Sequence, residues 1–328
     1  MTVIAITHAE ADLPRFFELT DLAALRAVAE VRVLGGNAPA LVLPQLADVD
    51  ILLGSWGMPQ LDAALLTAAP RLRAVCYAAG TVKGFVTPES YARNVLITTA
   101  MHANAVPVAE VTVALITLAN KSWFQAQVAM KAAALTKSTR RDVPHVGNFC
   151  TTVGLIGFGA IARLVAGKLR DMDQRVLLHD PYARDLPSHV EPVADLLELA
   201  RRSDVVSLHA PDIPTTHGMC GAAFFAAMRA GATFINTARG RLVDEPALIA
   251  ELQTGRISAH LDVTHPELPP ADSPFWTLPN VWLTPHLAGS SSGEIRRMGR
   301  LAIAECQAVI AGQPPRFRVT QAMLATMA

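Results

Sequence analysis

The chain has 328 residues, with 28 basic and 28 acidic side chains, so its formal net charge is zero at pH 7, and 51% of its residues are hydrophobic. This composition excludes an intrinsically disordered chain, and the length suffices for two domains with their own cores. The balanced charge is not typical of proteins that bind nucleic acid or an anionic membrane, so we expect neither partner.

Short β-branched runs alternate with alanine-rich segments of helical periodicity from the N-terminus onward. This alternation is typical of βα units that build a parallel sheet. In the first third, Leu13–Glu30 and Leu61–Ala68 are predicted helices. The predicted strands there are Val3–Ile6, Val31–Leu34, Ile51–Leu53, Ala74–Tyr77 and Val95–Thr98.

A long apolar helix is predicted over about Val106–Met130. Only 17% of the chain is charged, so we expect this helix to be buried against its own domain and a partner subunit, in a homodimer. Its longest apolar run, Ala105–Ala119, is interrupted by Glu110, and the N-terminus has no signal-peptide pattern. We therefore expect a cytoplasmic protein.

A polar stretch, Thr136–Asn148, precedes a second alternating series. Its last helix, about Ser292–Ala311, ends at Gly312 with two prolines beyond, which are stop signals. The predicted strands of this series are Thr152–Ile156, Arg175–His179, Val205–His209, Thr233–Asn236, Ser258–Leu261 and Val281–Leu283.

The four cysteines are scattered along the chain, at positions 76, 150, 220 and 306, and none has the spacing of zinc ligands. We expect reduced thiols and no metal site.

A dinucleotide-binding fingerprint follows the strand Thr152–Ile156, in the segment Gly157-Phe158-Gly159-Ala160-Ile161-Ala162. Gly157 permits the tight turn, Gly159 lets the backbone approach a pyrophosphate, and Ala162 permits close packing of helix on strand. The amides of Ala160 and Ile161 then face the phosphates at the positive end of a helix.

Asp180 ends the next strand, eighteen residues beyond Ala162. A carboxylate there accepts hydrogen bonds from the ribose hydroxyls and repels a 2′-phosphate, so we expect NAD rather than NADP. Arg184, four residues on, offers a positive charge to a phosphate and leaves NADP as the alternative.

Three further segments follow in order: FINTARGRLVDEPAL, HLDVTHPELPPADSPFWTLPNVWLTPH and PHLAG. With the fingerprint, they make the whole chain resemble the D-isomer-specific 2-hydroxyacid dehydrogenases. The resemblance implies that Arg239, Glu267 and His286 are the catalytic residues.

The chemistry of keto-acid reduction calls for the same residue types. Hydride adds to the carbonyl carbon and a proton to its oxygen, and a histidine side chain donates protons near neutral pH. A carboxylate at Glu267 fixes the tautomer of His286 and favours its imidazolium form. Arg239 binds the substrate carboxylate and polarises the carbonyl.

The resemblance implies further positions. Asp262 would hold the nicotinamide carboxamide, Thr237 and Ala238 would line the cofactor beside Arg239, and Leu287 to Gly289 would continue this side after His286. The loop AAGTVKG is similar to the segment whose backbone amides hold the substrate carboxylate, which assigns substrate contacts to Gly80, Thr81 and Val82. Asn104, in the segment HANAVPVAE, matches a family position at the cleft between the domains and is a further expected substrate contact. Four other histidines, at 209, 217, 260 and 265, lack such a context and are expected to be structural or incidental.

Several positions depart from the family pattern. The usual GTGVD form of the substrate loop is replaced here, with Val82, Lys83 and Gly84 in its second half, and Lys83 is either solvated or near the substrate. Trp56 either contacts the substrate side chain or lies in the core, and Trp123 is a candidate wall of the pocket. Formate dehydrogenases of this superfamily pair their histidine with glutamine, so Glu267 favours 2-hydroxyacid chemistry.

These observations predict two α/β domains, Rossmann-like and flavodoxin-like, each with a parallel sheet, and an active-site cleft between them. The resemblance implies a discontinuous substrate domain, 1–100 plus 293–328, and a NAD-binding domain, 101–292. The predicted activity is NAD(H)-dependent interconversion of a small 2-keto acid and a D-2-hydroxy acid. The alternatives are a dinucleotide-sensing regulatory protein of the same fold and a related phosphite or formate dehydrogenase.

Overall fold

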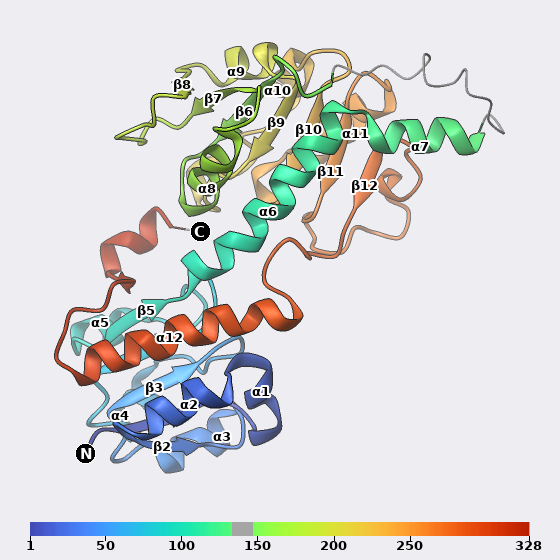
Figure 1. The fold of residues 1–328 in the computed structure, drawn as a ribbon. Helices are drawn as coiled ribbons and strands as arrows, with labels where there is room; N and C mark the ends of the chain where they lie inside the picture. The colour runs from blue at the N-terminus through green and yellow to red at the C-terminus, as the bar shows by residue number, and fades with distance from the viewer. Residues whose placement is uncertain (133–146, 328) are drawn as a thin grey trace. The chain divides into compact units, whose positions relative to one another are not determined.

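The computed structural model describes residues 1–132 and 147–327, and these residues divide into two compact units (Figure 1). Unit 1 comprises Met1–Asn104 and Ser290–Met327, and unit 2 comprises Ala105–Gly289. Most of the predicted polar stretch Thr136–Asn148 lies outside the described residues.

Unit 1 is built on a six-stranded sheet with the order β13-β5-β4-β3-β1-β2. Strands β1 to β5 are parallel, and β13 adds antiparallel to β5. The order β2-β1-β3-β4-β5 is the flavodoxin-like arrangement, whose switch point lies between β1 and β3. The strands are β1 Val3–Ile6, β2 Glu30–Val33, β3 Ile51–Gly54, β4 Ala74–Tyr77, β5 Leu96–Thr99 and β13 Arg318–Val319.

Helices cover both faces of this sheet because alternate strand residues are apolar on both sides. Ile4, Ile51 and Cys76 face a core shared with α1 Leu13–Phe16, α2 Leu19–Arg26 and α12 Ile295–Ile310. Leu52 and Val75 face the opposite core, shared with α3 Pro39–Val42 and α4 Ala63–Ala68. The short helix α5, Pro88–Ala92, precedes β5.

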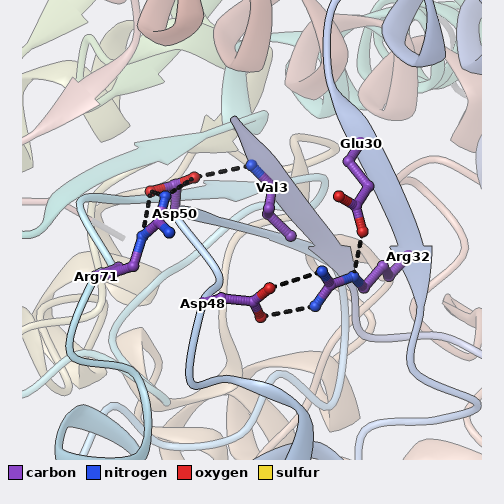
Figure 2. A network of polar contacts seen from close by, with 6 residues as sticks. All are labelled: Val3, Glu30, Arg32, Asp48, Asp50 and Arg71. Carbon is purple, nitrogen blue, oxygen red and sulfur yellow. Dashed lines mark hydrogen bonds and ion pairs between the residues drawn. The ribbon is translucent and has the colours of Figure 1, made fainter. Parts of the chain in front are cut away.

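Charged side chains join the amino-terminal ends of β1, β2 and β3 (Figure 2). The carboxylate of Asp50 accepts hydrogen bonds from the backbone N–H of Val3, at 2.8 Å, and from the guanidinium of Arg71, at 3.0 Å. Arg32 makes a bidentate contact with Asp48, with both distances 2.7 Å, and a further one with Glu30. These contacts pair each of the two guanidinium groups with a carboxylate at this end of the sheet.

Unit 2 is built on a seven-stranded sheet with the order β12-β11-β10-β9-β6-β7-β8, in which every pair is parallel. This is the Rossmann arrangement, with its switch point between β6 and β9. The strands are β6 Thr152–Ile156, β7 Arg175–His179, β8 Val190–Pro192, β9 Val205–Leu208, β10 Thr233–Asn236, β11 Ser258–Leu261 and β12 Val281–Leu283.

Helices α9 Leu196–Arg202, α10 Ala222–Ala227 and α11 Glu245–Gln253 cover one face of this sheet, where Phe234 lies in the core. The other face packs Val153 and Leu155 against α8, Ala160–Leu169, and against α6, Met101–Asn120. Within the described part of the chain, α6 is the one helix long and apolar enough to span a membrane by length and composition, and three of its side chains, Ala109, Ile116 and Ala119, are part of this core.

The prediction of one helix over Val106–Met130 is wrong. Helix α6 begins earlier, at Met101, and ends at Asn120; α7, Trp123–Ala132, begins after a break. Ser122 in the break has φ of +47°, a left-handed conformation that an α-helix does not accommodate. The apolar periodicity on both sides continues across this break, so it gives no sign of the break.

The predicted strands are confirmed, with ends that differ by one residue in places, while two short strands and several helix breaks were not predicted. The predicted helix Leu13–Glu30 is instead two helices, because Phe17 and Glu18 between them are extended, and the second helix ends at Arg26, before Glu30 begins β2. The last helix begins at Ile295 after a short turn and ends before Gly312, whose φ is +68°.

Candidate active site

The carboxyl-terminal edge of the unit 2 sheet gathers most of the predicted site residues. Gly157 follows β6, Asp180 follows β7, Thr237 to Arg239 follow β10, and Asp262 follows β11. His286 comes three residues after β12. Parallel register brings all of these loops to one edge, which is where ligands bind in doubly wound sheets.

The turn after β6 requires glycine at its first position. Gly157 has φ of +86°, and a Cβ there would lie 2.7 Å from the backbone nitrogen of Ala210, in the loop after β9. Gly159 differs, since a Cβ there would meet no atom within 4 Å. This open space, with the amides of Ala160 and Ile161 in the first turn of α8, fits a pyrophosphate approaching the backbone.

Asp180 lies beside this turn. Its carboxylate accepts hydrogen bonds from the backbone N–H groups of Phe158, at 2.7 Å, and Tyr182, at 2.8 Å. The side chain is therefore fixed next to the glycine-rich loop, where a ribose would lie if a dinucleotide bound. The guanidinium of Arg184 donates to the carbonyls of Pro181 and Ala183.

His209, expected to be structural, is buried behind the same turn. Its Nε2 lies 2.9 Å from the Ser207 hydroxyl, and its Nδ1 has no hydrogen-bond partner among the described residues. Burial lowers the pKa of this imidazole to about 4. A buried neutral ring against the Gly157 turn agrees with a structural role.

The segment after β10 is held by the side chain of Asn236, the last residue of that strand. The Asn236 Oδ1 accepts from the N–H of Ala238, and its Nδ2 donates to the carbonyl of Arg239, both at 3.0 Å. Thr237 is buried, and its hydroxyl lies 3.2 Å from that of Thr112 in α6. Arg239 is half-buried, and its guanidinium donates to the Ala238 carbonyl at 2.6 Å, which holds it at this edge.

His286 and Glu267 form the central pair of the site. Imidazole Nδ1 lies 2.5 Å from Glu267 Oε1, and the two side chains are 45% and 61% exposed. His286 has φ of +55°, and its backbone N–H donates to the carbonyls of Asp262 and Thr284. A strained backbone that presents an imidazole already bonded to a carboxylate is typical of an acid–base centre.

Asp262 holds the loop that carries His286. This buried carboxylate accepts three hydrogen bonds, from the hydroxyl of Thr284 at 2.5 Å and from the amides of Leu287 at 2.7 Å and Ala288 at 2.9 Å. Gly289 follows directly and ends unit 2. The nicotinamide contact assigned to Asp262 stays a prediction.

In unit 1, the loop after β4 leaves backbone amides without protein acceptors. Within residues 1–132 and 147–327, the backbone N–H groups of Gly80, Thr81 and Val82 donate to no protein acceptor, whereas the Val82 carbonyl accepts from Phe85. Thr81 is exposed and Gly80 is half-buried, whereas Val82 is fully buried in the core. Successive free amides at Gly80 and Thr81 favour an anion.

Asn104 lies beside this loop. A Cβ on Gly80 would lie 4.0 Å from the Asn104 amide nitrogen, and Asn104 Oδ1 accepts from the backbone N–H of Ser290 at 2.8 Å. The structure thus brings Asn104 to Gly80 and leaves its amide N–H₂ group facing the loop. Lys83 is exposed.

Aromatic side chains line the switch point of the unit 1 sheet. His8 follows β1 and Ser55 follows β3, and the imidazole Nε2 lies 2.9 Å from the serine hydroxyl. Phe16 stacks on His8 with centroids 4.3 Å apart and lies 6.0 Å from the ring of Trp56, which is 44% exposed. Burial lowers the pKa of His8, so this aromatic shelf (His8, Phe16 and Trp56) is uncharged at neutral pH.

Sequence reasoning missed three residues that hold the loops of Glu267 and His286: Thr264, Glu245 and Thr284. Each acts on a partner distant in sequence or on a backbone group, which side-chain motifs do not reveal.

Trp123, at the start of α7, is 62% exposed. In the described part of the chain, no group of three or more His, Cys, Asp or Glu side chains is placed to hold a metal ion.

Comparison with known proteins agrees with this geometry. Residues 113–288 match the family model for the NAD-binding domain of D-isomer specific 2-hydroxyacid dehydrogenases. A glyoxylate reductase of Thermofilum pendens is 30% identical over 294 residues, which are 86% of this chain and 85% of that protein. The D-mandelate dehydrogenase of Rhodotorula graminis shares the fold, with a TM-score of 0.82 and 22% identity over 98% of both chains.

A D-3-phosphoglycerate dehydrogenase of Methanocaldococcus jannaschii is 29% identical over 296 residues, which are 88% of this chain but only 55% of that protein. The chain thus spans about half the length of the first curated relatives that it matches. Since the family model covers more than half of the chain and the glyoxylate reductase is matched over most of its length, the chain belongs to the D-isomer-specific 2-hydroxyacid dehydrogenase family.

Proposed function

We propose that this protein is an NAD(H)-dependent oxidoreductase that interconverts a 2-keto acid and a D-2-hydroxy acid. The observation that carries the proposal is the His286–Glu267 pair, 2.5 Å apart, on the same sheet edge as the dinucleotide turn. An acid–base pair beside a hydride-carrying cofactor is what this reaction needs.

The residues of unit 2 fit a dinucleotide, since Gly159 leaves open space at the amino end of α8 and Asp180 is fixed beside it. When bound, the nicotinamide supplies or accepts the hydride. Because Glu267 engages Nδ1 of His286, Nε2 is the nitrogen left to deliver a proton to the carbonyl oxygen as C2 becomes tetrahedral. In the oxidation direction the neutral imidazole takes this proton from the hydroxyl, and Glu267 stabilises the resulting imidazolium.

NAD is the proposed cofactor, in preference to NADP. Asp180 places a carboxylate where a 2′-phosphate would be repelled, whereas the guanidinium of Arg184 is engaged with neighbouring carbonyls. Thr237, Ala238, Asp262 and Gly289 are proposed to line the nicotinamide side.

The backbone amides of Gly80, Thr81 and Val82 are the proposed ligands of the substrate carboxylate, with Asn104 beside them, and those of Gly80 and Thr81 are the more accessible. Arg239 is proposed to bind the carboxylate and to polarise the carbonyl as negative charge develops on its oxygen. The proposal therefore requires substrate contacts from both units.

For the substrate side chain we propose an apolar or aromatic group. The aromatic shelf lies at the switch point of unit 1, where ligands bind in such sheets, and it offers ring faces and an uncharged imidazole. Trp56→Ala is expected to raise KM for phenylpyruvate by about tenfold, with a smaller change for glyoxylate, because stacking contributes about 1 kcal/mol beyond the buried area. Equal changes for the two substrates would contradict this assignment.

A cytoplasmic homodimer is the proposed assembly. Val111 of α6 and Trp123, Val128 and Met130 of α7 are exposed apolar side chains on consecutive helices. Covering such side chains with a second copy would remove apolar surface from water. Sedimentation equilibrium of the wild type and of Trp123→Glu tests this assembly, and a monomeric wild-type protein would contradict it.

The activity is tested by following NADH consumption with glyoxylate, hydroxypyruvate, pyruvate, phenylpyruvate and a branched-chain keto acid. His286→Ala is expected to abolish turnover while leaving the NADH dissociation constant unchanged. Wild-type turnover by this variant would refute the mechanism. NADH binding without consumption of any keto acid would favour a dinucleotide-sensing protein, and NAD reduction by phosphite or formate would favour the neighbouring activities.

A further inference from the structure

The loop that carries Glu267 is held at one peptide group, between Thr264 and His265. The backbone N–H of His265 donates to Glu245 Oε1 at 2.6 Å. On its other side the peptide lies against Gly240, where an added Cβ would overlap the Thr264 carbonyl group. One peptide is thus fixed by a carboxylate and by the backbone that follows Arg239.

The short segment between this peptide and Glu267 is tied to it. The Thr264 hydroxyl donates to the carbonyls of Pro266, at 2.8 Å, and Glu267, at 2.9 Å. Movement of the Thr264–His265 peptide would therefore carry the Glu267 backbone with it. Since the Glu267 carboxylate is 61% exposed, the loop backbone rather than side-chain packing determines where it points.

We propose that Glu245 is a positioning residue, which holds the 264–267 loop so that Glu267 meets Nδ1 of His286. This inference rests on the proposed function for its effect on turnover. Glu245 begins α11 and lies twenty residues before the amide that it binds, so it connects two segments that side-chain motifs treat separately.

A role confined to stabilising α11 is the competing explanation, because acidic side chains favour helix amino termini. Asp244 already caps this helix, because its side chain accepts a hydrogen bond from the N–H of Ala247 at 3.2 Å. Glu245 instead reaches out of the helix to His265, and burial raises the pKa of its carboxyl group. The two neighbouring acids therefore give a matched pair for experiment.

Three variants separate the two roles. Glu245→Ala removes the acceptor, Glu245→Gln keeps an acceptor oxygen without the charge, and Asp244→Ala removes the helix cap. Glu245 lines an open cavity of about 480 Å³, so truncation enlarges a cavity at the surface rather than the core, and folding of each variant is checked by circular dichroism.

We expect Glu245→Ala to lower kcat by about tenfold to a hundredfold, as misplacement of a reacting group does, with little change in the NADH dissociation constant. Glu245→Gln should recover kcat to within about threefold of wild type, because a neutral acceptor still binds the His265 amide. Asp244→Ala should lower the melting temperature and leave kcat within about twofold. Wild-type kcat in Glu245→Ala, or equal loss in Asp244→Ala, would overturn the proposal.

A second measurement does not depend on turnover. In protein labelled with ¹³C in its histidine rings, the His286 ring resonances of Glu245→Ala at a fixed pH should move away from those of wild type and towards those of Glu267→Gln, because Nδ1 loses its contact with the Glu267 carboxylate in both variants. Wild-type His286 resonances in Glu245→Ala would refute the positioning role, whereas the expected change in a protein that reduces no keto acid would refute only the proposed function.

Discussion

Replacement of Asp262 gives the sharpest quantitative prediction, because one buried carboxylate holds the whole loop that carries His286. The side chain is 5% exposed, and Oδ1 accepts from the Thr284 hydroxyl and the Leu287 amide while Oδ2 accepts from the Ala288 amide. Asp262→Asn keeps a carbonyl oxygen in the position of Oδ1, but its N–H₂ group then faces the Ala288 N–H. Asp262→Ala removes all three acceptor contacts.

The cost follows from the number of donors left without a partner. A buried donor without an acceptor costs about 1–3 kcal/mol, and the Ala288 amide is the most deeply buried of the three. We therefore expect the free energy of unfolding to fall by about 1–2 kcal/mol in Asp262→Asn and by about 2–4 kcal/mol in Asp262→Ala. The value for Asp262→Ala is smaller than three times the cost of one buried donor, because water can reach the Leu287 amide at the exposed end of the loop.

Urea-induced unfolding followed by circular dichroism measures both values, with Asp272→Asn as a control at an exposed aspartate of the same unit. The control should lie within about 0.5 kcal/mol of wild type. A loss below about 0.5 kcal/mol in Asp262→Ala, or a larger loss in Asp262→Asn than in Asp262→Ala, would refute the assignment of three acceptor contacts.

Three further predictions follow from single contacts. Gly157→Ala combines a positive φ with a Cβ 2.7 Å from the Ala210 nitrogen, so thermal unfolding should show a loss of about 2–4 kcal/mol and NADH titration a weaker affinity; wild-type values would contradict the geometry. Burial lowers the pKa of His260 to about 4, so the unfolded state binds more protons between pH 6.5 and 4, and stability falls as the pH falls through this window. The His260 ring stacks on Trp282, and phenylalanine is the replacement closest in shape. His260→Phe should reduce the slope of unfolding free energy against pH by up to about 1.4 kcal/mol per pH unit, measured by urea unfolding at successive pH values. An unchanged slope would exclude His260 as its source. Asp180→Ser should lower the preference for NADH over NADPH, measured as the ratio of kcat/KM values, by about tenfold or more, and an unchanged ratio would remove Asp180 from cofactor selection.

The fold could be predicted from the sequence where local pattern and tertiary structure agree. β-branched runs such as Thr152–Ile156 are strands because both faces of a parallel sheet are covered, and the glycines that follow turn where the pattern requires it. Strands β8 and β13 were missed, since they have three and two residues, and β8 ends in a proline at the edge of its sheet. Segments this short form strands only because they pair with a neighbouring strand, β7 for β8 and β5 for β13.

For the candidate site, the side-chain motifs predicted which residues to examine but not what holds them. The pairing of His286 with Glu267 was implied by the family resemblance, and the chemistry of proton transfer gave its reason; the structure places the two side chains 2.5 Å apart. The bond from the His265 amide to Glu245 and the close approach at Gly240 involve backbone groups, which have the same chemistry at every position. Only the folded chain shows which of them meet.

The close contact between α12 and the amino-terminal part of unit 1 bears on how the chain folds during synthesis. Gly299 lets this helix lie directly on the backbone carbonyl of Phe16, where any Cβ would overlap. Unit 2 is one continuous stretch of chain, whereas unit 1 contains two stretches that are far apart in sequence. The face of the unit 1 sheet that includes Ile4 and Ile51 is covered by α12, which comes from the second of these stretches. On the ribosome, unit 2 can therefore complete its core first, while the earliest-made strands stay partly uncovered until α12, which is translated after unit 2, covers them.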